Sequence, residues 1–130
     1  MQAQKIKIED LEDLANERIK DAKVLCEAGR YFGAVYICGY ALELGLKKQI
    51  CCTLGWDEYP TESKYKSLKT HDLEVLLHFS GKEKLVIANL QAQWSIVLQW
   101  NPEARYSASS VMESQAKHMI EATEAILGSL

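Results

Sequence analysis

One stretch of the sequence, from Arg30 to Thr53, restricts the possible folds more than any other. It contains no proline, and its residues are apolar on nearly all sides of a helix. One helical face comprises Phe32, Val35, Tyr36, Gly39, Leu42, Leu46 and Ile50. The charged residues of the stretch are Arg30, Glu43, Lys47 and Lys48. These charges argue against a membrane span, so we expect the central helix of a soluble bundle, with one side left for a partner subunit.

Glu43 is a charged residue in the middle of this apolar face, where a buried side chain is expected. A buried carboxylate is costly unless it is paired or protonated. The amphipathic stretch before Gly29 carries Arg18 within its apolar stripe. We expect the two helices to form a hairpin, packed antiparallel about a turn near Gly29 and Arg30. Both helices rise equally per residue, so the numbers of two facing residues should add up to about 60. We therefore predict a structural ion pair between Arg18 and Glu43; the alternative is that Glu43 shapes a polar pocket.

Length and charge set wide limits on the class of protein. A chain of 130 residues predicts one domain, residues 1–130, with a core from about 8 to 128. The net charge of −3 indicates that any nucleic-acid surface must be local. The first ten residues lack the apolar segment of a secretory signal, so we expect a cytoplasmic protein with no membrane contact.

The cysteines favour neither a disulfide nor a metal site. They are Cys26, Cys38, Cys51 and Cys52. None forms a C-x-x-C motif, and all lie in apolar, helical surroundings where a free thiol behaves as a small hydrophobe. We expect four buried thiols, no bound metal and no cofactor.

Helical periodicity predicts an all-α, up-and-down bundle of about five helices, four main ones and one short one. The expected helices are Ile8–Ala28, Arg30–Thr53, the short His71–Phe79 capped by Thr70, Lys82–Trp100, and one that begins near Ser109 or Ser110. The last start is indicated by a capping box between Ser110 and Glu113. Gly55 and Pro60 make residues 54–70 a long irregular connection.

Several strings in a fixed order carry a resemblance to a known family. They are A-x-x-R-x-x-x-A from Ala15 to Ala22, GRYFGAVYICGYALELGLKK from Gly29 to Lys48, THDLEVLL from Thr70 to Leu77, and RYS from Arg105 to Ser107. In this order and spacing the chain resembles the HEPN domain, the higher eukaryotes and prokaryotes nucleotide-binding domain. The resemblance covers residues from about 15 to 127.

The resemblance implies a helical bundle that forms a homodimer and binds or acts on RNA. It also implies a possible partner protein, a minimal nucleotidyltransferase, in a toxin–antitoxin pair. Catalytic members carry Arg, four to six residues and then His, and build a metal-independent ribonuclease site across the dimer. This chain lacks that motif, and Lys66 ahead of His71 is the nearest substitute. Lysine lacks the planar fork with which arginine binds phosphate.

The candidate site residues surround His71, which is expected at a helix N-terminus where phosphate can bind. His71 and Lys66 are the candidate catalytic residues. The candidate nucleotide- or RNA-binding residues are Lys64, Tyr65, Lys66, Lys69, Arg105 and Tyr106. Lysines and aromatic residues in one loop can follow a single strand and stack on its bases, although such loops are more often simply solvated.

Three functions remain open at this point. The first is a non-catalytic module that binds a nucleotide, RNA or a partner protein, which the missing Arg–His motif favours. The second is a metal-independent ribonuclease toxin that uses Lys66 and His71 across a dimer. The third is a purely structural dimerisation protein, built on the spare apolar side of the central helix.

Overall fold

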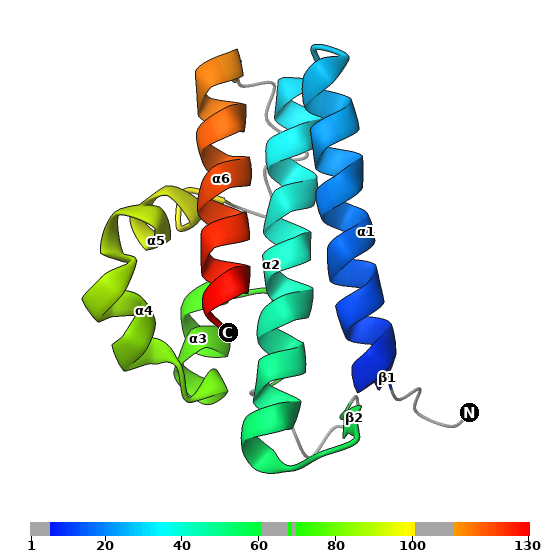
Figure 1. Ribbon diagram of the computed structural model, residues 1–130, viewed down its shortest axis with the longest axis vertical. Helices are drawn as coiled ribbons and strands as arrows, with labels where there is room; N and C mark the ends of the chain where they lie inside the picture. Colours follow the sequence, from blue (N-terminus) through cyan, green and yellow to red (C-terminus); the bar gives the residue numbers. More distant parts are fainter. Residues whose placement is uncertain (1–5, 61–67, 69, 101–110) are drawn as a thin grey trace.

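The computed structural model describes residues 6–60, 68, 70–100 and 111–130, and it confirms the predicted all-α fold (Figure 1). The three long helices are α1 (Ile8–Glu27), α2 (Tyr31–Leu54) and α6 (Glu113–Ser129). They lie side by side, with α2 between the other two. The short helices α3 (Leu73–Ser80), α4 (Glu83–Asn89) and α5 (Gln91–Val97) form an arm beside this bundle.

Helix α2 is the central helix, as its all-round apolar sequence predicts. It packs against α1, α3 and α6. Its buried residues are Ala34, Cys38, Gly39, Ala41, Leu42, Glu43, Gly45, Leu46, Ile50 and Cys51. Across the described part of the chain, no helix is both long and apolar enough to span a membrane.

Helices α1 and α2 form the predicted antiparallel hairpin. Gly29 lies between them with a positive φ of 78°, a conformation that glycine adopts without strain. Further along the pair, Lys48 Nζ lies 3.4 Å from Glu12 Oε2. Because these two residue numbers add up to 60, the contact confirms the predicted register.

The predicted ion pair between Arg18 and Glu43 is wrong. Arg18 Nε instead donates to Asp21 Oδ2 on its own helix, at 2.9 Å, and the arginine side chain is 36% exposed. The buried stripe of α1 comprises Leu11, Ala15, Ile19 and Ala22. Ile19 holds the place that the prediction assigned to Arg18, so the stripe is rotated by one residue and the arginine faces away from Glu43.

The second half of the chain begins its helices later than predicted and divides one of them. The expected helix Lys82–Trp100 is two helices, because Leu90 leaves the helical region at φ −132° and ψ 32°. This break lets α5 pack against α6, while α4 packs mainly against α3 and α5. Helix α3 begins at Leu73 rather than His71, with Asp72 and not Thr70 as its cap.

The predicted start of helix α6, near Ser109 or Ser110, lies outside the described residues. Its first residue is Glu113, and the carbonyl oxygen of the Gln115 side chain accepts a hydrogen bond from Met112 N at 2.7 Å. A capping interaction therefore exists, but it joins Met112 and Gln115, two residues later in the chain than the predicted Ser110–Glu113 box.

A pair of short strands was not predicted, and the prediction of four buried thiols is wrong for two of them. Strands β1 (Ile6–Lys7) and β2 (Glu58–Tyr59) pair antiparallel, with Ile6 opposite Tyr59. This pairing ties the connection after α2 to the start of α1. Of the thiols, Cys38 and Cys51 are buried as expected, whereas Cys26 is partly buried and Cys52 is exposed.

Candidate functional site

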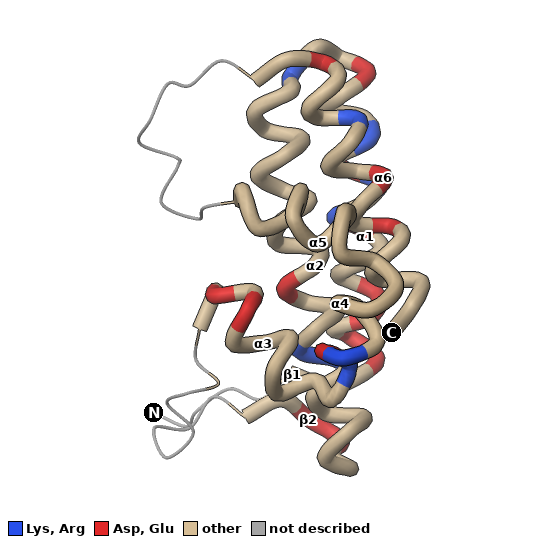
Figure 2. The backbone as a smooth tube through the Cα atoms, turned by 90° about the vertical axis from the view of Figure 1, so that its left-hand side faces the viewer, with Lys and Arg blue, Asp and Glu red and all other residues tan. Residues whose placement is uncertain are grey.

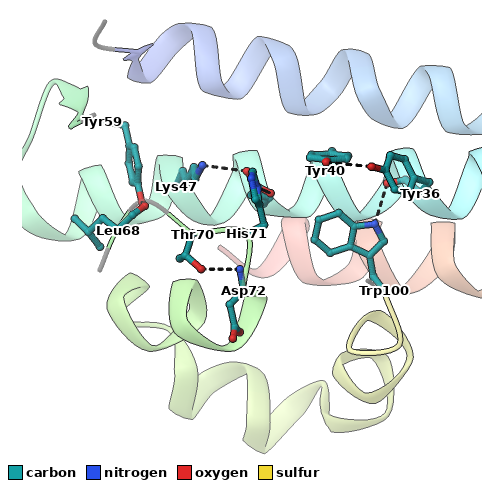
Figure 3. Close-up of polar contacts among 10 residues, drawn as sticks. Tyr36, Tyr40, Lys47, Tyr59, Leu68, Thr70, His71, Asp72 and Trp100 are labelled. Carbon is teal, nitrogen blue, oxygen red and sulfur yellow. Dashed lines mark hydrogen bonds and ion pairs between the residues drawn. The ribbon is translucent and has the colours of Figure 1, made fainter. Parts of the chain in front are cut away.

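Glu43 is the centre of a polar cluster in an otherwise apolar core. Its side chain is only 5% exposed, and both of its carboxylate oxygens are engaged. Oε2 accepts a hydrogen bond from Lys47 Nζ at 3.0 Å, and Oε1 lies 2.8 Å from Nδ1 of His71 (Figure 3). The alternative reading of the sequence, in which Glu43 shapes a polar site, therefore describes its surroundings better than the predicted pair with Arg18.

Lys47 is the partner that the sequence analysis missed. It follows Glu43 by four residues, the spacing at which Glu–Lys pairs meet on one helix face, so the signal was present in the sequence. Its ammonium group also lies 5.3 Å from the ring centroid of Tyr59 on β2. Tyr59 is buried and donates its hydroxyl hydrogen to the carbonyl oxygen of Leu68, and burial raises the pKa of its phenol. Lys47 thus links the cluster to the unpredicted strand pair.

His71 lies at the outer edge of the cluster, with a side chain 59% exposed. A carboxylate oxygen can only accept, so Nδ1 carries the hydrogen of the bond to Glu43. In the neutral ring the other nitrogen, Nε2, then holds a lone pair. A carboxylate that fixes the tautomer and orientation of an imidazole in this way prepares Nε2 to accept a hydrogen bond or a proton.

Aromatic side chains from α2 and from the residues after α5 pack together beside His71. The ring of Tyr40 packs edge-on against the His71 imidazole, with 6.1 Å between the ring centroids, and against the Trp100 indole, with 5.1 Å between the centroids. Trp100 is 8% exposed and donates its indole hydrogen to the carbonyl oxygen of Tyr36 at 3.0 Å. Trp100 is therefore a core residue that also borders the candidate site (Figure 3).

A surface pocket of about 400 Å³ opens at the start of α3. It is lined by Thr70, His71, Asp72, Leu73, Glu74, Leu98 and Trp100.

The family model of the HEPN domain matches residues 8–130, which is nearly the whole chain. The chain belongs to the HEPN domain family. No curated protein and no solved structure matches it.

Among the described residues, the charges at the pocket of this HEPN domain are mostly negative. Figure 2 shows acidic positions at the start of α3, where Asp72 and Glu74 lie. Asp72 Oδ1 accepts hydrogen bonds from Glu74 N at 2.9 Å and Val75 N at 3.3 Å. The N-terminal N–H groups that were expected to attract phosphate are therefore already bound by a carboxylate of the chain itself.

Most of the predicted contact residues of the HEPN domain lie outside the described residues. They are Lys64, Tyr65, Lys66, Lys69, Arg105 and Tyr106. Their approach to His71, and the pairing of Lys66 with His71, stay predictions. Among the residues that are described, no group of three or more His, Cys, Asp or Glu side chains could hold a metal ion.

Proposed function

We propose that this HEPN domain is an RNA-binding module that takes one nucleoside of a single strand into the pocket at the start of α3. The observation that carries the proposal is the 2.8 Å contact between His71 Nδ1 and Glu43 Oε1. It leaves Nε2 as an acceptor at the pocket, and a ribose 2′-hydroxyl, the group that distinguishes RNA from DNA, can donate to such an acceptor. The family membership supports a nucleotide- or RNA-related role.

The pocket has the composition expected of a nucleoside site. Leu73, Leu98 and the edge of Trp100 supply apolar surface, while the remaining lining residues supply polar groups. Its volume of about 400 Å³ falls in the usual range for small-molecule sites. Bases of single-stranded RNA can leave the stack and enter such a pocket, whereas those of a duplex cannot.

Fluorescence anisotropy with a labelled single-stranded RNA 12-mer tests this proposal. We expect His71→Ala to weaken binding about tenfold, the effect of losing one well-placed hydrogen bond. The matched control is His78→Ala, because His78 is also an exposed histidine on the α3 side of the molecule but does not line the pocket. Equal binding by the His71 and His78 variants, or no binding by the wild type, would refute the proposal.

Metal-independent RNA cleavage is the second candidate, and the Glu43–His71 hydrogen bond specifically favours it. In this reaction Nε2 removes the 2′-hydroxyl proton, O2′ attacks the adjacent phosphorus, and the bond to the 5′-oxygen breaks. A second group must protonate the leaving 5′-oxygen. The described lining of one pocket holds a single imidazole, so we propose that a second copy of the chain, or Lys66, provides this proton.

Two measurements separate binding from cleavage. Incubation of RNA with the protein in EDTA should yield 2′,3′-cyclic phosphate ends if the second candidate holds, and none if the protein only binds. A substrate with 2′-deoxyribose at the cleaved position should be inert. Sedimentation equilibrium tests whether the protein forms a homodimer. Co-purification with a minimal nucleotidyltransferase produced in the same cells tests the proposed partner.

A further inference from the structure

The described lining of the pocket is rich in hydrogen-bond acceptors. The carboxylates of Asp72 and Glu74 lie beside His71, and no Lys or Arg is among the described lining residues. A phosphate group would therefore meet two like charges there. The part of an RNA that enters this pocket should be neutral and should present N–H or O–H donors.

The two carboxylates differ in what already binds them. Asp72 accepts from two backbone N–H groups of α3, and its own N–H donates to Thr70 Oγ1 at 2.9 Å. The Glu74 carboxylate is exposed and has no hydrogen bond or ion pair with any residue in the described ranges. Within the described residues, both Glu74 oxygens are available to a ligand, whereas Oδ1 of Asp72 is already bound by the backbone of α3.

A carboxylate with two available oxygens recognises one RNA base better than the others. Guanine presents two adjacent donors, N1–H and the 2-amino group, on a single edge, and these match the two oxygens. Adenine and cytosine present one amino group beside an acceptor nitrogen, which the carboxylate repels. Uracil presents a single N–H between two carbonyl groups.

We infer that Glu74 makes the pocket selective for guanine, with the base between the apolar wall and the Glu74 carboxylate and its ribose toward His71. The inference rests on the proposed RNA binding and adds a specificity to it. Glu74 stands in the first turn of α3, and the His71 ring, just ahead of the cap residue Asp72, is held by its contact with Glu43, so both groups line the pocket from fixed places. A site built to bind two donors discriminates against a base that lacks one of them.

The test uses three 12-mers of uridine that differ at one central position, which is guanosine, inosine or adenosine. Inosine keeps N1–H but lacks the 2-amino donor. We expect the wild type to bind the guanosine strand about tenfold more tightly than the other two. Glu74→Gln should remove this preference by weakening only the guanosine strand, and circular dichroism melting confirms that the variant is folded.

A matched control variant is Glu121→Gln, because Glu121 is an exposed glutamate of α6 that does not line the pocket. It should keep the full preference for guanosine. Binding that depends on His71 but is equal for all three strands would overturn the guanine inference alone. Absence of binding that depends on His71 would overturn the proposed function together with it.

Discussion

The indole ring of Trp100 lies directly against the backbone of Gly39. A β-carbon added at residue 39 would lie 2.0 Å from Cε2 of the indole, far inside van der Waals contact. The same ring borders the pocket and is held by its hydrogen bond to the Tyr36 carbonyl oxygen. The missing side chain at residue 39 is therefore what allows Trp100 to pack on α2 and form a wall of the site.

Gly39→Ala should displace Trp100 and destabilise the protein. Overpacking of this kind costs about 2 kcal/mol in the free energy of unfolding, measured by urea titration. Gly33→Ala is the control on the same helix, since a β-carbon there would lie 3.6 Å from Leu25 Cδ1 in ordinary contact. It should stabilise the helix by about 0.5 kcal/mol. Equal effects of the two substitutions would show that Trp100 does not pack on Gly39.

Glu43→Gln should be the most damaging single change in the polar cluster. It leaves the Lys47 ammonium, whose side chain is 14% exposed, without its charged partner. Breaking a buried ion pair on one side costs about 3 kcal/mol in the free energy of unfolding. Loss of the Glu43 contact also frees the His71 ring, so RNA binding should weaken as it does in His71→Ala.

Glu113→Gln is the matched control for this prediction. Glu113 and Lys117 form a pair with the same spacing of four residues at 2.8 Å, but both side chains are more than half exposed. Solvent screens such a pair, so we expect no measurable change in stability. The prediction for Glu43 would be contradicted if both variants unfolded at the same urea concentration.

Much of this architecture could be predicted because it follows from patterns within single segments. The all-round apolar character of α2 and the turn at Gly29 predicted the central helix, the hairpin and its register. The rotation of α1 was predicted wrongly because the apolar stripe was placed one residue away from Ile19. An error of one residue turns a helix by about 100°, enough to move Arg18 from the core to solvent.

The site was harder to predict because its members come from distant segments. Glu43 and His71 were each singled out by the sequence, but nothing in either segment indicated that they touch. The contact depends on the path of the chain between α2 and α3 and on the capping of α3 by Asp72. The role of Gly39 could not be predicted either, because the need for a glycine in a helix becomes clear only when the residue packed against it is known.

Arg18→Gln tests the corrected position of that side chain. An exposed pair between Arg18 and Asp21 contributes about 0.5 kcal/mol or less, because solvent screens it. We therefore expect the free energy of unfolding to stay within that range of the wild-type value. A loss of several kcal/mol would instead indicate that the arginine is buried against Glu43, as the sequence first suggested.

The thiols should differ sharply in reactivity. Only the thiolate reacts with alkylating reagents, and burial raises the pKa of Cys38 to about 12 and that of Cys51 to about 11. Cys52 is exposed. Iodoacetamide at pH 8 should therefore label Cys52 quickly in the folded protein, and Cys38 and Cys51 only after unfolding. Peptide mass spectrometry measures the order, and early labelling of Cys38 would contradict the fold around α2.

The buried thiols also predict how stability depends on pH. Cys38 keeps its proton in the folded state up to a pKa of about 12, whereas in the unfolded chain it titrates near its ordinary value of 9.0. Above pH 9 the unfolded state thus binds fewer protons than the folded state, so the free energy of unfolding falls as pH rises. By pH 10 this one thiol should lower it by about 1.4 kcal/mol relative to neutral pH. Cys38→Ala should remove that part of the loss. The free energies of unfolding from urea titrations at pH 8 and pH 10 should therefore differ less for the variant than for the wild type. An equal difference would show that the Cys38 thiol has the same pKa in the folded and unfolded states.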